Sequence, residues 1–240
     1  MKRLITLILA ASFLTGCATV NEMAFDKKST SLDTSQKSVV LMTVEVSRSD
    51  NSRFVPEPNV VRLDIPGVPD KAGHQNFKIN KESDFVATND HKIYLIRMAL
   101  PPGTYRLDDV TGFARAFPIN GMFMVPLYVN FTVQPNSVTY VGRVNAQLRS
   151  RKDGEFRAGP VVPLIDQAAA GMSGGTWDIS IDDLAESDIE TFRSNFPVLS
   201  NLKIEKIILP AFDRQLVQDM WDGKVKLNQV SISTSTNTVK

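Results

Sequence analysis

The chain has 240 residues, and its 27 basic and 26 acidic side chains give a formal net charge of +1. No long block of one sign provides the basic footprint that nucleic-acid binding needs, so no nucleic-acid partner is expected. Cys17 is the only cysteine, which excludes an internal disulfide.

The N-terminus combines a short basic segment with an apolar run. Lys2 and Arg3 precede apolar residues 4–13, which are too few to cross a bilayer core of roughly 30 Å as a stable helix. This arrangement is typical of a secretory signal, so residues 1–16 are predicted to be a signal peptide. Its removal takes away Lys2 and Arg3 and changes the formal charge from +1 to −1.

The apolar run ends in Leu14, Thr15, Gly16 and Cys17. This order resembles the lipobox of bacterial lipoproteins. The resemblance implies signal-peptidase recognition of the first three residues, cleavage before Cys17, and lipidation of Cys17 with acyl chains such as palmitate. Because Ala18 rather than Asp follows the cysteine, analogy with enteric sorting favours the outer membrane, on its periplasmic side. The alternative is an ordinary signal peptide with an incidental cysteine.

Residues 17–37 are predicted to be a flexible, lipidated tether. From residue 20 onward this segment is polar and rich in Ser, Thr, Lys and Asp, a composition that favours disorder. Met23 and Phe25 are its apolar exceptions, and they could dock on the folded body.

From residue 38 to 182 the dominant hydrophobic period is two, which predicts β-strands. Turn signals separate the strands, and Asn120–Gly121 is predicted to be the turn of a hairpin. The expected strands cover residues 39–46, 61–65, 93–100, 104–110, 127–133, 138–149 and 177–182. Short strands at this spacing favour a mainly β fold, an antiparallel β-sandwich over residues 38–182.

Two segments carry a second resemblance. Residues 100–107, Leu-Pro-Pro-Gly-Thr-Tyr-Arg-Leu, resemble the start of a strand in prealbumin-like and carboxypeptidase-regulatory-like sandwiches. Residues 131–142 are similar to a strand pair of uncharacterised bacterial lipoproteins of that type, in which Gly often replaces Asn136. Asn also tolerates positive φ, so the departure costs little. The resemblance covers about residues 38–150 and implies a fold but no activity.

The last part of the sequence changes character. Residues 183–232 predict a small α/β appendage of helix, strand and helix, and residues 233–240 predict a frayed tail. A capping box marks the first helix, and an N-cap and a terminal glycine mark the second. The residues concerned are Ser187 and Glu190, then Asp213 and Gly223.

Residues 171–175 fit the G-x-S-x-G pattern, in which Ser173 would be the nucleophile of a serine hydrolase. That motif requires a strand followed by a sharp turn and a helix. Residues 176–181 predict a strand instead, and both histidines, His74 and His91, precede the serine, contrary to the hydrolase order. A flexible loop is therefore favoured over catalysis.

Other candidate sites are weaker. Two histidines cannot form a three-histidine zinc site, and Asp178, Asp182 and Asp183 lack the spacing of a calcium loop. No metal or cofactor is predicted. Trp177 is in phase with the apolar side of its strand and is expected in the core. Trp221 is also assigned to the core, with a partner-facing anchor as the alternative.

Three functional hypotheses follow. The leading one is a lipid-anchored, non-enzymatic interaction or structural module of the cell envelope, bound to the membrane through Cys17 and contacting an envelope protein. The second is a binding module for a small molecule, lipid or glycan, which would need a concave apolar pocket. The third is a hydrolase that uses Ser173.

Overall fold

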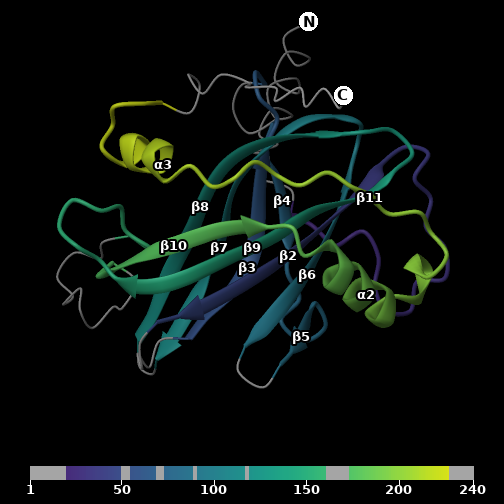
Figure 1. The fold of residues 1–240 in the computed structure, drawn as a ribbon, viewed down its shortest axis with the longest axis horizontal. Coiled ribbons are helices and arrows are strands. Elements are labelled where there is room, and N and C mark those ends of the chain that lie inside the picture. Colours follow the sequence, from purple (N-terminus) through teal and green to yellow (C-terminus); the bar gives the residue numbers. More distant parts are fainter. Residues whose placement is uncertain are drawn as a thin grey trace, which may run out of the picture.

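The computed structural model describes residues 20–49, 55–68, 73–88, 91–116, 119–160 and 173–226 (Figure 1). The elements follow in the order β1 (Val20–Asn21), β2 (Ser38–Arg48), β3 (Val55–Asp64), β4 (Gln75–Lys78), β5 (Phe85–Ala87), β6 (Lys92–Leu100), β7 (Gly103–Ala116), β8 (Ile119–Val133), β9 (Val138–Ser150), β10 (Gly175–Asp182), α2 (Ala185–Asn195), the 3-10 helix η2 (Pro197–Leu199), β11 (Glu205–Lys206) and α3 (Arg214–Trp221).

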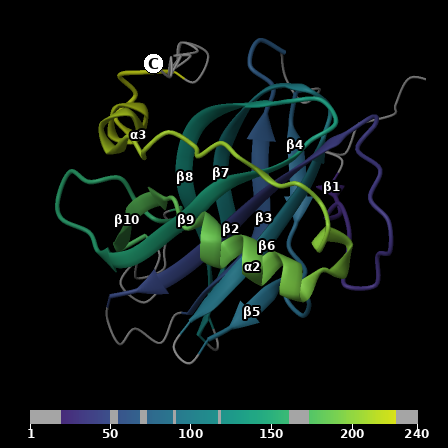
Figure 2. The same cartoon turned by 45° about the vertical axis from the view of Figure 1, so that its right-hand side comes forward.

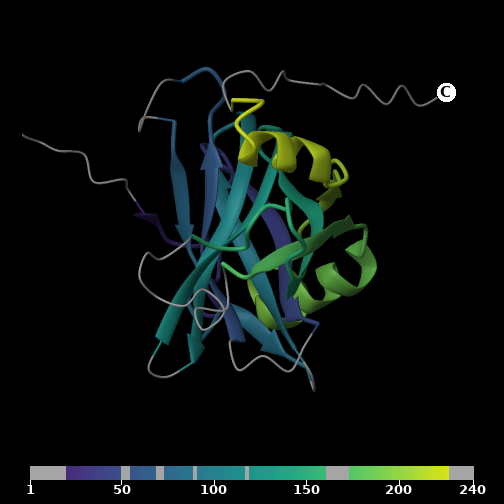
Figure 3. The ribbon, with the colours of Figure 1, turned by 90° about the vertical axis from the view of Figure 1, so that its left-hand side faces the viewer.

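The strands form two mixed sheets that share a core (Figure 3). Sheet A has the order β1-β4-β3-β7-β8, and sheet B has the order β10-β9-β2-β6-β5, with β11 added to β9. The mainly β expectation is confirmed, but the strictly antiparallel pairing is not, because β2 runs parallel to β9, β1 to β4, and β11 to β9. A period of two defines the faces of a strand and not the direction of its neighbours.

The core between the sheets follows from this alternation. Along β8, Phe123, Val125 and Leu127 are buried at every second position. Trp177 of β10 is fully buried, and its ring meets that of Phe123 edge-on at 5.5 Å. Its Nε1 donates to the Met124 carbonyl at 2.8 Å, so the polar atom of this large side chain is satisfied. The predicted core position of Trp177 is confirmed.

A second core lies on the outer face of sheet B. Phe192 and Phe196, from α2 and the turn after it, pack with Leu41 of β2 and Tyr140 of β9 (Figure 1). Strand β2 is therefore covered on both faces, which explains the uninterrupted apolar start of its sequence. No helix among the described residues is long and apolar enough to cross a membrane.

The N-terminal segment differs from its prediction as a flexible tether. Strand β1 pairs with β4 in sheet A, and the Ala24 amide then donates to the Arg97 carbonyl of β6 in sheet B at 2.8 Å. Phe25 is 94% buried, and its ring meets Phe196 edge-on at 5.4 Å. Within residues 20–37, Met23 and Phe25 thus outweigh the polar composition, and the segment crosses from one sheet to the other (Figure 2).

Two local boundaries also differ. The β7–β8 hairpin forms, but Asn120 and Gly121 belong to its strand pairing, opposite Arg115 and Ala114. Helix α2 begins at Ala185 rather than after Ser187, so the expected capping box does not form. Ser187 instead lies inside the first turn, where its hydroxyl donates to the Leu184 carbonyl at 3.2 Å.

The predicted limits of the second C-terminal helix are confirmed. The Asp213 side chain accepts from the Leu216 amide at 2.9 Å, and Gly223 after the helix has a φ of +72°. Asn136, in the turn between β8 and β9, has a φ of +53°, as its similarity to a glycine position implied. In both turns the residue type meets the backbone requirement.

Candidate functional site

A candidate site is a cavity of about 580 Å³ at one end of the sandwich, here named the end cavity. It lies where β2 ends, β3 begins and the β5–β6 turn closes, toward the bottom of Figure 1. Its volume falls within the usual range for small-molecule pockets. The lining residues are Val46, Ser47, Arg48, Val55, Pro56, Glu57, Ala87, Thr88, His91, Lys92 and Tyr94.

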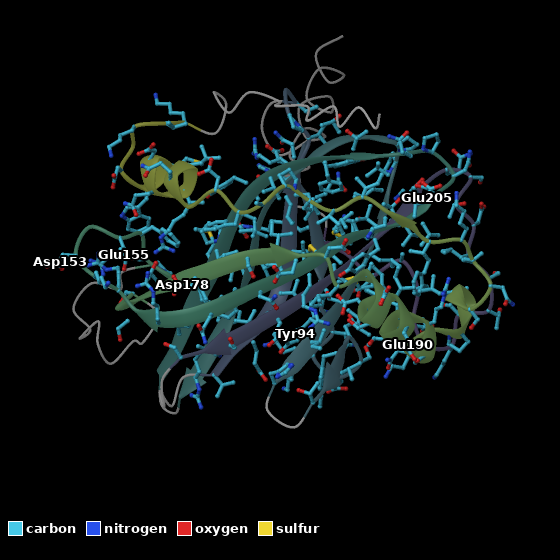
Figure 4. All side chains as sticks on the ribbon, viewed as in Figure 1. Tyr94, Asp153, Glu155, Asp178, Glu190 and Glu205 are labelled. Atoms are coloured by element: carbon cyan, nitrogen blue, oxygen red, sulfur yellow. The ribbon has the colours of Figure 1, made fainter. Side chains whose placement is uncertain are left out.

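Tyr94 is among the residues that line the end cavity and is labelled in Figure 4. Its side chain is 97% buried and tilts against Phe85 at 6.0 Å between ring centroids. Burial, reinforced by the negative charge of Glu57, raises the pKa of Tyr94 to about 12. The phenol is therefore neutral at physiological pH and can donate a hydrogen bond.

Two acidic residues near the end cavity are neutralised by their neighbours. Lys92 Nζ lies 3.2 Å from one carboxylate oxygen of Glu57, and Lys81 Nζ lies 4.0 Å from the other. His91 Nε2 lies 3.6 Å from a carboxylate oxygen of Glu45. The Lys92 ammonium also sits 4.7 Å from the centre of the Phe85 ring, a cation–π contact.

Arg48 is the unusual group of the end cavity. Its Nη1 atom is shielded from solvent and has no hydrogen-bond partner. A guanidinium group carries five N–H donors and stays charged throughout the physiological range. Unpaired charge removed from water is unfavourable, so this position calls for an acceptor that the described residues do not supply.

The outer face of sheet A holds a second charged cluster, but its members satisfy one another. Arg62 Nε donates to Asp109 at 2.7 Å, while Arg106 contacts Asp64 at 2.8 Å and Asp108 at 2.5 Å. Burial raises the pKa of Asp109 and of Asp108, and their arginine partners oppose this shift. Because the carboxylates already bind guanidinium groups, this cluster is best explained as structural.

The sequence-predicted site residues fall in different places. Cys17, Leu14, Thr15 and Gly16 lie outside the described residues. Ser173 is fully buried, and its carbonyl accepts from Arg157 at 2.6 Å.

The residues around Ser173 form a turn that leads into strand β10, not into a helix, as the sequence indicated. Gly171 and Met172 of the same motif are outside the described part. A nucleophile in this fold would therefore lack the strand–turn–helix support of the hydrolase motif.

The histidines and aspartates do not form a joint site. His74 lies 3.6 Å from Asp64, whereas His91 lies beside Glu45. Within the described ranges, no group of three or more His, Cys, Asp or Glu side chains is arranged to hold a metal ion. The side chain of Asp178 is 51% exposed and contacts Arg149 at 2.8 Å, in agreement with a solvated strand face.

The assignment of Trp221 to the core is wrong, since the residue is 48% exposed. Helix α3 buries only Val217 fully, and Trp221 occupies its last turn, where the helix leaves the sheet. The tryptophan instead borders a 230 Å³ hollow shared with Met124, Tyr128 and Met220. An amphipathic pattern of eight residues was too short to fix which side chains face inward.

A surface network at the other edge of the sandwich gives a pH-dependent prediction. Hydrogen bonds from Arg149 lower the pKa of Glu155 to about 2, with Arg214 at 3.0 Å adding to the effect (Figure 4). Because the unfolded pKa is about 4.3, the ionised Glu155 stabilises the fold above that pH, and this contribution is lost as pH falls toward 2. Glu155→Gln should therefore flatten the fall of Tm between about pH 5 and pH 2.

The measurement is a series of thermal melts from pH 7 to pH 2. Glu205→Gln provides the control, because the Glu205 carboxylate contacts the highly exposed Lys203 at 3.0 Å. Equal slopes of Tm against pH in the Glu155 variant and the unmodified chain would contradict the role of the network.

Comparison with protein-family models, with curated proteins and with solved structures gave no match, so the functional argument rests on this chain's own residues.

Proposed function

We propose that the chain is a lipid-anchored, non-enzymatic module of the cell envelope, attached to the periplasmic side of the outer membrane through Cys17. The observation that carries the proposal is where the fold begins. The lipobox-like residues end at Cys17, and Val20 is already paired with Asn76 of β4. Three residues span at most about 11 Å. The lipid would therefore hold the sandwich directly against the leaflet instead of on a long tether.

An interaction role is supported by the outer face of sheet A. Phe113 and Met122 pair across β7 and β8, and they are 39% and 49% exposed. Trp221 is also exposed beside the same sheet, next to Met124. Exposed apolar side chains grouped in this way are typical of protein contact surfaces. An envelope protein is accordingly the proposed partner.

The proposal also includes a prealbumin-like fold for the sandwich. The strand start that carries the resemblance is tied down locally, because the Tyr105 hydroxyl donates to the Pro101 carbonyl at 2.9 Å. This contact fixes the Pro-Pro-Gly-Thr-Tyr segment at the start of β7 and gives the tyrosine a structural use. It supports a likeness of fold and carries no activity.

Cys17→Ala tests the anchor. The unmodified chain should incorporate an alkyne-labelled palmitate during growth and fractionate with membranes, because buried acyl chains contribute about 0.8 kcal/mol per CH₂. The alanine variant should lose the label and leave the membrane fraction, while Ser29→Ala should behave like the unmodified chain. Retention of the label in the alanine variant would exclude Cys17 as the lipid site.

A second measurement tests how close the β-sandwich lies to the membrane surface. A fluorophore on Val20→Cys, an exposed position in β1, should be quenched by a headgroup-linked quencher. Asp153→Cys, at the β8 side of the sandwich, is the matched position away from the anchor (Figure 4). Equal quenching at both positions in a lipidated protein would show that the β1 end of the sandwich is not held close to the membrane. The conclusion that Cys17 carries the lipid would remain.

A further inference from the structure

We propose that the end cavity binds an organic anion, a carboxylate on a medium-sized apolar body, with Arg48 as the counter-charge. The proposal is independent of lipidation, because it rests on the residues at one end of the sandwich. Three separate observations support it: Arg48 Nη1 has no partner among the described residues, the nearby carboxylates are paired with other side chains, and the rest of the cavity wall is apolar.

The first observation is the contrast between Arg48 and the other buried arginines. Arg97 binds Asp84 at 2.8 Å, Arg106 binds Asp64 at 2.8 Å, and Arg143 pairs with Asp188. These three guanidinium groups, which are largely removed from water, thus each meet a carboxylate. Within the described ranges Arg48 has no such partner, although its Nη1 is shielded from solvent.

The second observation is that the nearby carboxylates are already used. Glu57 faces Lys92 and Lys81, and Glu45 faces His91 and Arg143, each at 4.0 Å or less. Among the described residues, the Arg48 guanidinium group therefore has no carboxylate to compensate its charge. An anionic ligand in the cavity would pair with this guanidinium group through a charge-assisted hydrogen bond, the strong type in proteins.

The third observation is the apolar character of the remaining wall. Val46, Val55, Pro56 and Ala87 line the cavity together with the ring of Tyr94. An inorganic anion would leave these side chains in contact with water, and a neutral apolar molecule would leave Arg48 unpaired. A volume of about 580 Å³ also exceeds what one small ion fills. A carboxylate with an aliphatic or aromatic body satisfies both requirements.

The test uses the full chain in lipid nanodiscs and measures binding by saturation-transfer difference NMR. The probes are 4-phenylbutyrate, its neutral analogue 4-phenylbutan-1-ol, and inorganic phosphate. The acid should bind more tightly than the alcohol and than phosphate. Equal binding of acid and alcohol, or no binding of the acid, would overturn the proposal.

Two variants separate Arg48 from general charge effects. Arg48→Gln should weaken 4-phenylbutyrate binding by about tenfold to a hundredfold, the usual effect of losing a hydrogen bond to a charged group. Arg193→Gln removes the same charge from the surface of α2 and should leave binding unchanged. Full binding by the Arg48 variant would place the probe elsewhere.

The Tm of the unliganded Arg48→Gln variant distinguishes a ligand-binding role of Arg48 from a structural role, because only a structural role predicts a clear decrease. Because Arg48 Nη1 has no hydrogen-bond partner among the described residues, Arg48→Gln should keep or raise the Tm of the unliganded chain. Addition of 4-phenylbutyrate should raise the Tm of the unmodified chain and not that of the variant. A clear drop in the unliganded Tm would show that Arg48 holds the fold, and the proposal would fail.

Discussion

Asp188→Ala is expected to destabilise the fold by about 3–5 kcal/mol, the usual cost of breaking a buried, hydrogen-bonded ion pair. Asp188 lies in the first turn of α2 and is fully buried against sheet B. Its carboxylate accepts from the hydroxyls of Thr43 and Tyr140, each at 2.5 Å, and from the guanidinium group of Arg143. Removing the carboxylate leaves three donors without an acceptor in a dry site, so the loss exceeds that of a single bond.

Urea unfolding monitored by circular dichroism measures this change. Asp183→Ala is the matched control, since Asp183 is an exposed carboxylate that contacts Lys206 at 2.7 Å. Its removal should change the unfolding free energy very little, because surface ion pairs contribute weakly. The network at Asp188 would be refuted by a loss in the Asp188 variant as small as that of the control.

The same network affects tyrosine ionisation. Burial, followed by the hydrogen bond to Asp188, raises the pKa of Tyr140 above its ordinary value of 10.0. The Tyr140 phenol therefore keeps its proton through the physiological range and remains a donor to the carboxylate. This donor is one reason why the charged Asp188 can be buried on the inner side of α2.

Phe25→Ala is expected to cost about 3–5 kcal/mol, as for other buried phenylalanines. The Phe25 ring holds the N-terminal segment against Phe196, at 5.4 Å between ring centroids. The Phe25 carbonyl also accepts from Arg97 Nε at 3.0 Å. The Arg97 guanidinium lies 5.6 Å from the centre of the Phe25 ring and 4.2 Å from that of Phe196, so Phe25→Ala also removes a cation–π contact. The N-terminal segment should then detach from β6.

Val20→Ala is the control for this experiment, because Val20 belongs to the same segment but is 50% exposed. Chemical denaturation should distinguish the two variants, and limited proteolysis should cut the Phe25 variant first within residues 20–37. A Phe25 variant as stable as the Val20 variant would restore the interpretation of this segment as a free tether.

Much of the sheet structure could be predicted because alternation survives in the residue pattern. The expected strand at residues 138–149 matches β9, Val138–Ser150, and that at 93–100 matches β6, Lys92–Leu100. Strands β4 and β5 were missed, since four and three residues are too few to show a period. Parallel pairing was missed because it depends on which end of the sandwich each strand enters.

The candidate site was harder to predict from the sequence than the strands. Arg48 is the last residue of β2 and lies beyond the predicted strand at residues 39–46, and nothing beside it in the sequence indicates that its Nη1 would lack a partner among the described residues. That property depends on Glu57 and Glu45, which bind lysine, histidine and arginine side chains from other segments. The burial of Asp188 could not be predicted from the sequence either. A charged residue in a helix usually faces solvent, and the partners of Asp188, Thr43 and Tyr140, are distant in the chain.

The crossing made by the N-terminal segment sets an order in which parts of the fold can form. Residues 20–25 precede their partners in β4 and β6 by more than 50 residues. Val20 and Asn21 can pair only once β4 has been synthesised, and Ala24 only once Arg97 has followed. If Cys17 is lipidated as proposed, a modifying enzyme that acts before β4 and β6 are present would meet an unfolded substrate, whereas one that acts later would find paired residues three positions beyond the cysteine.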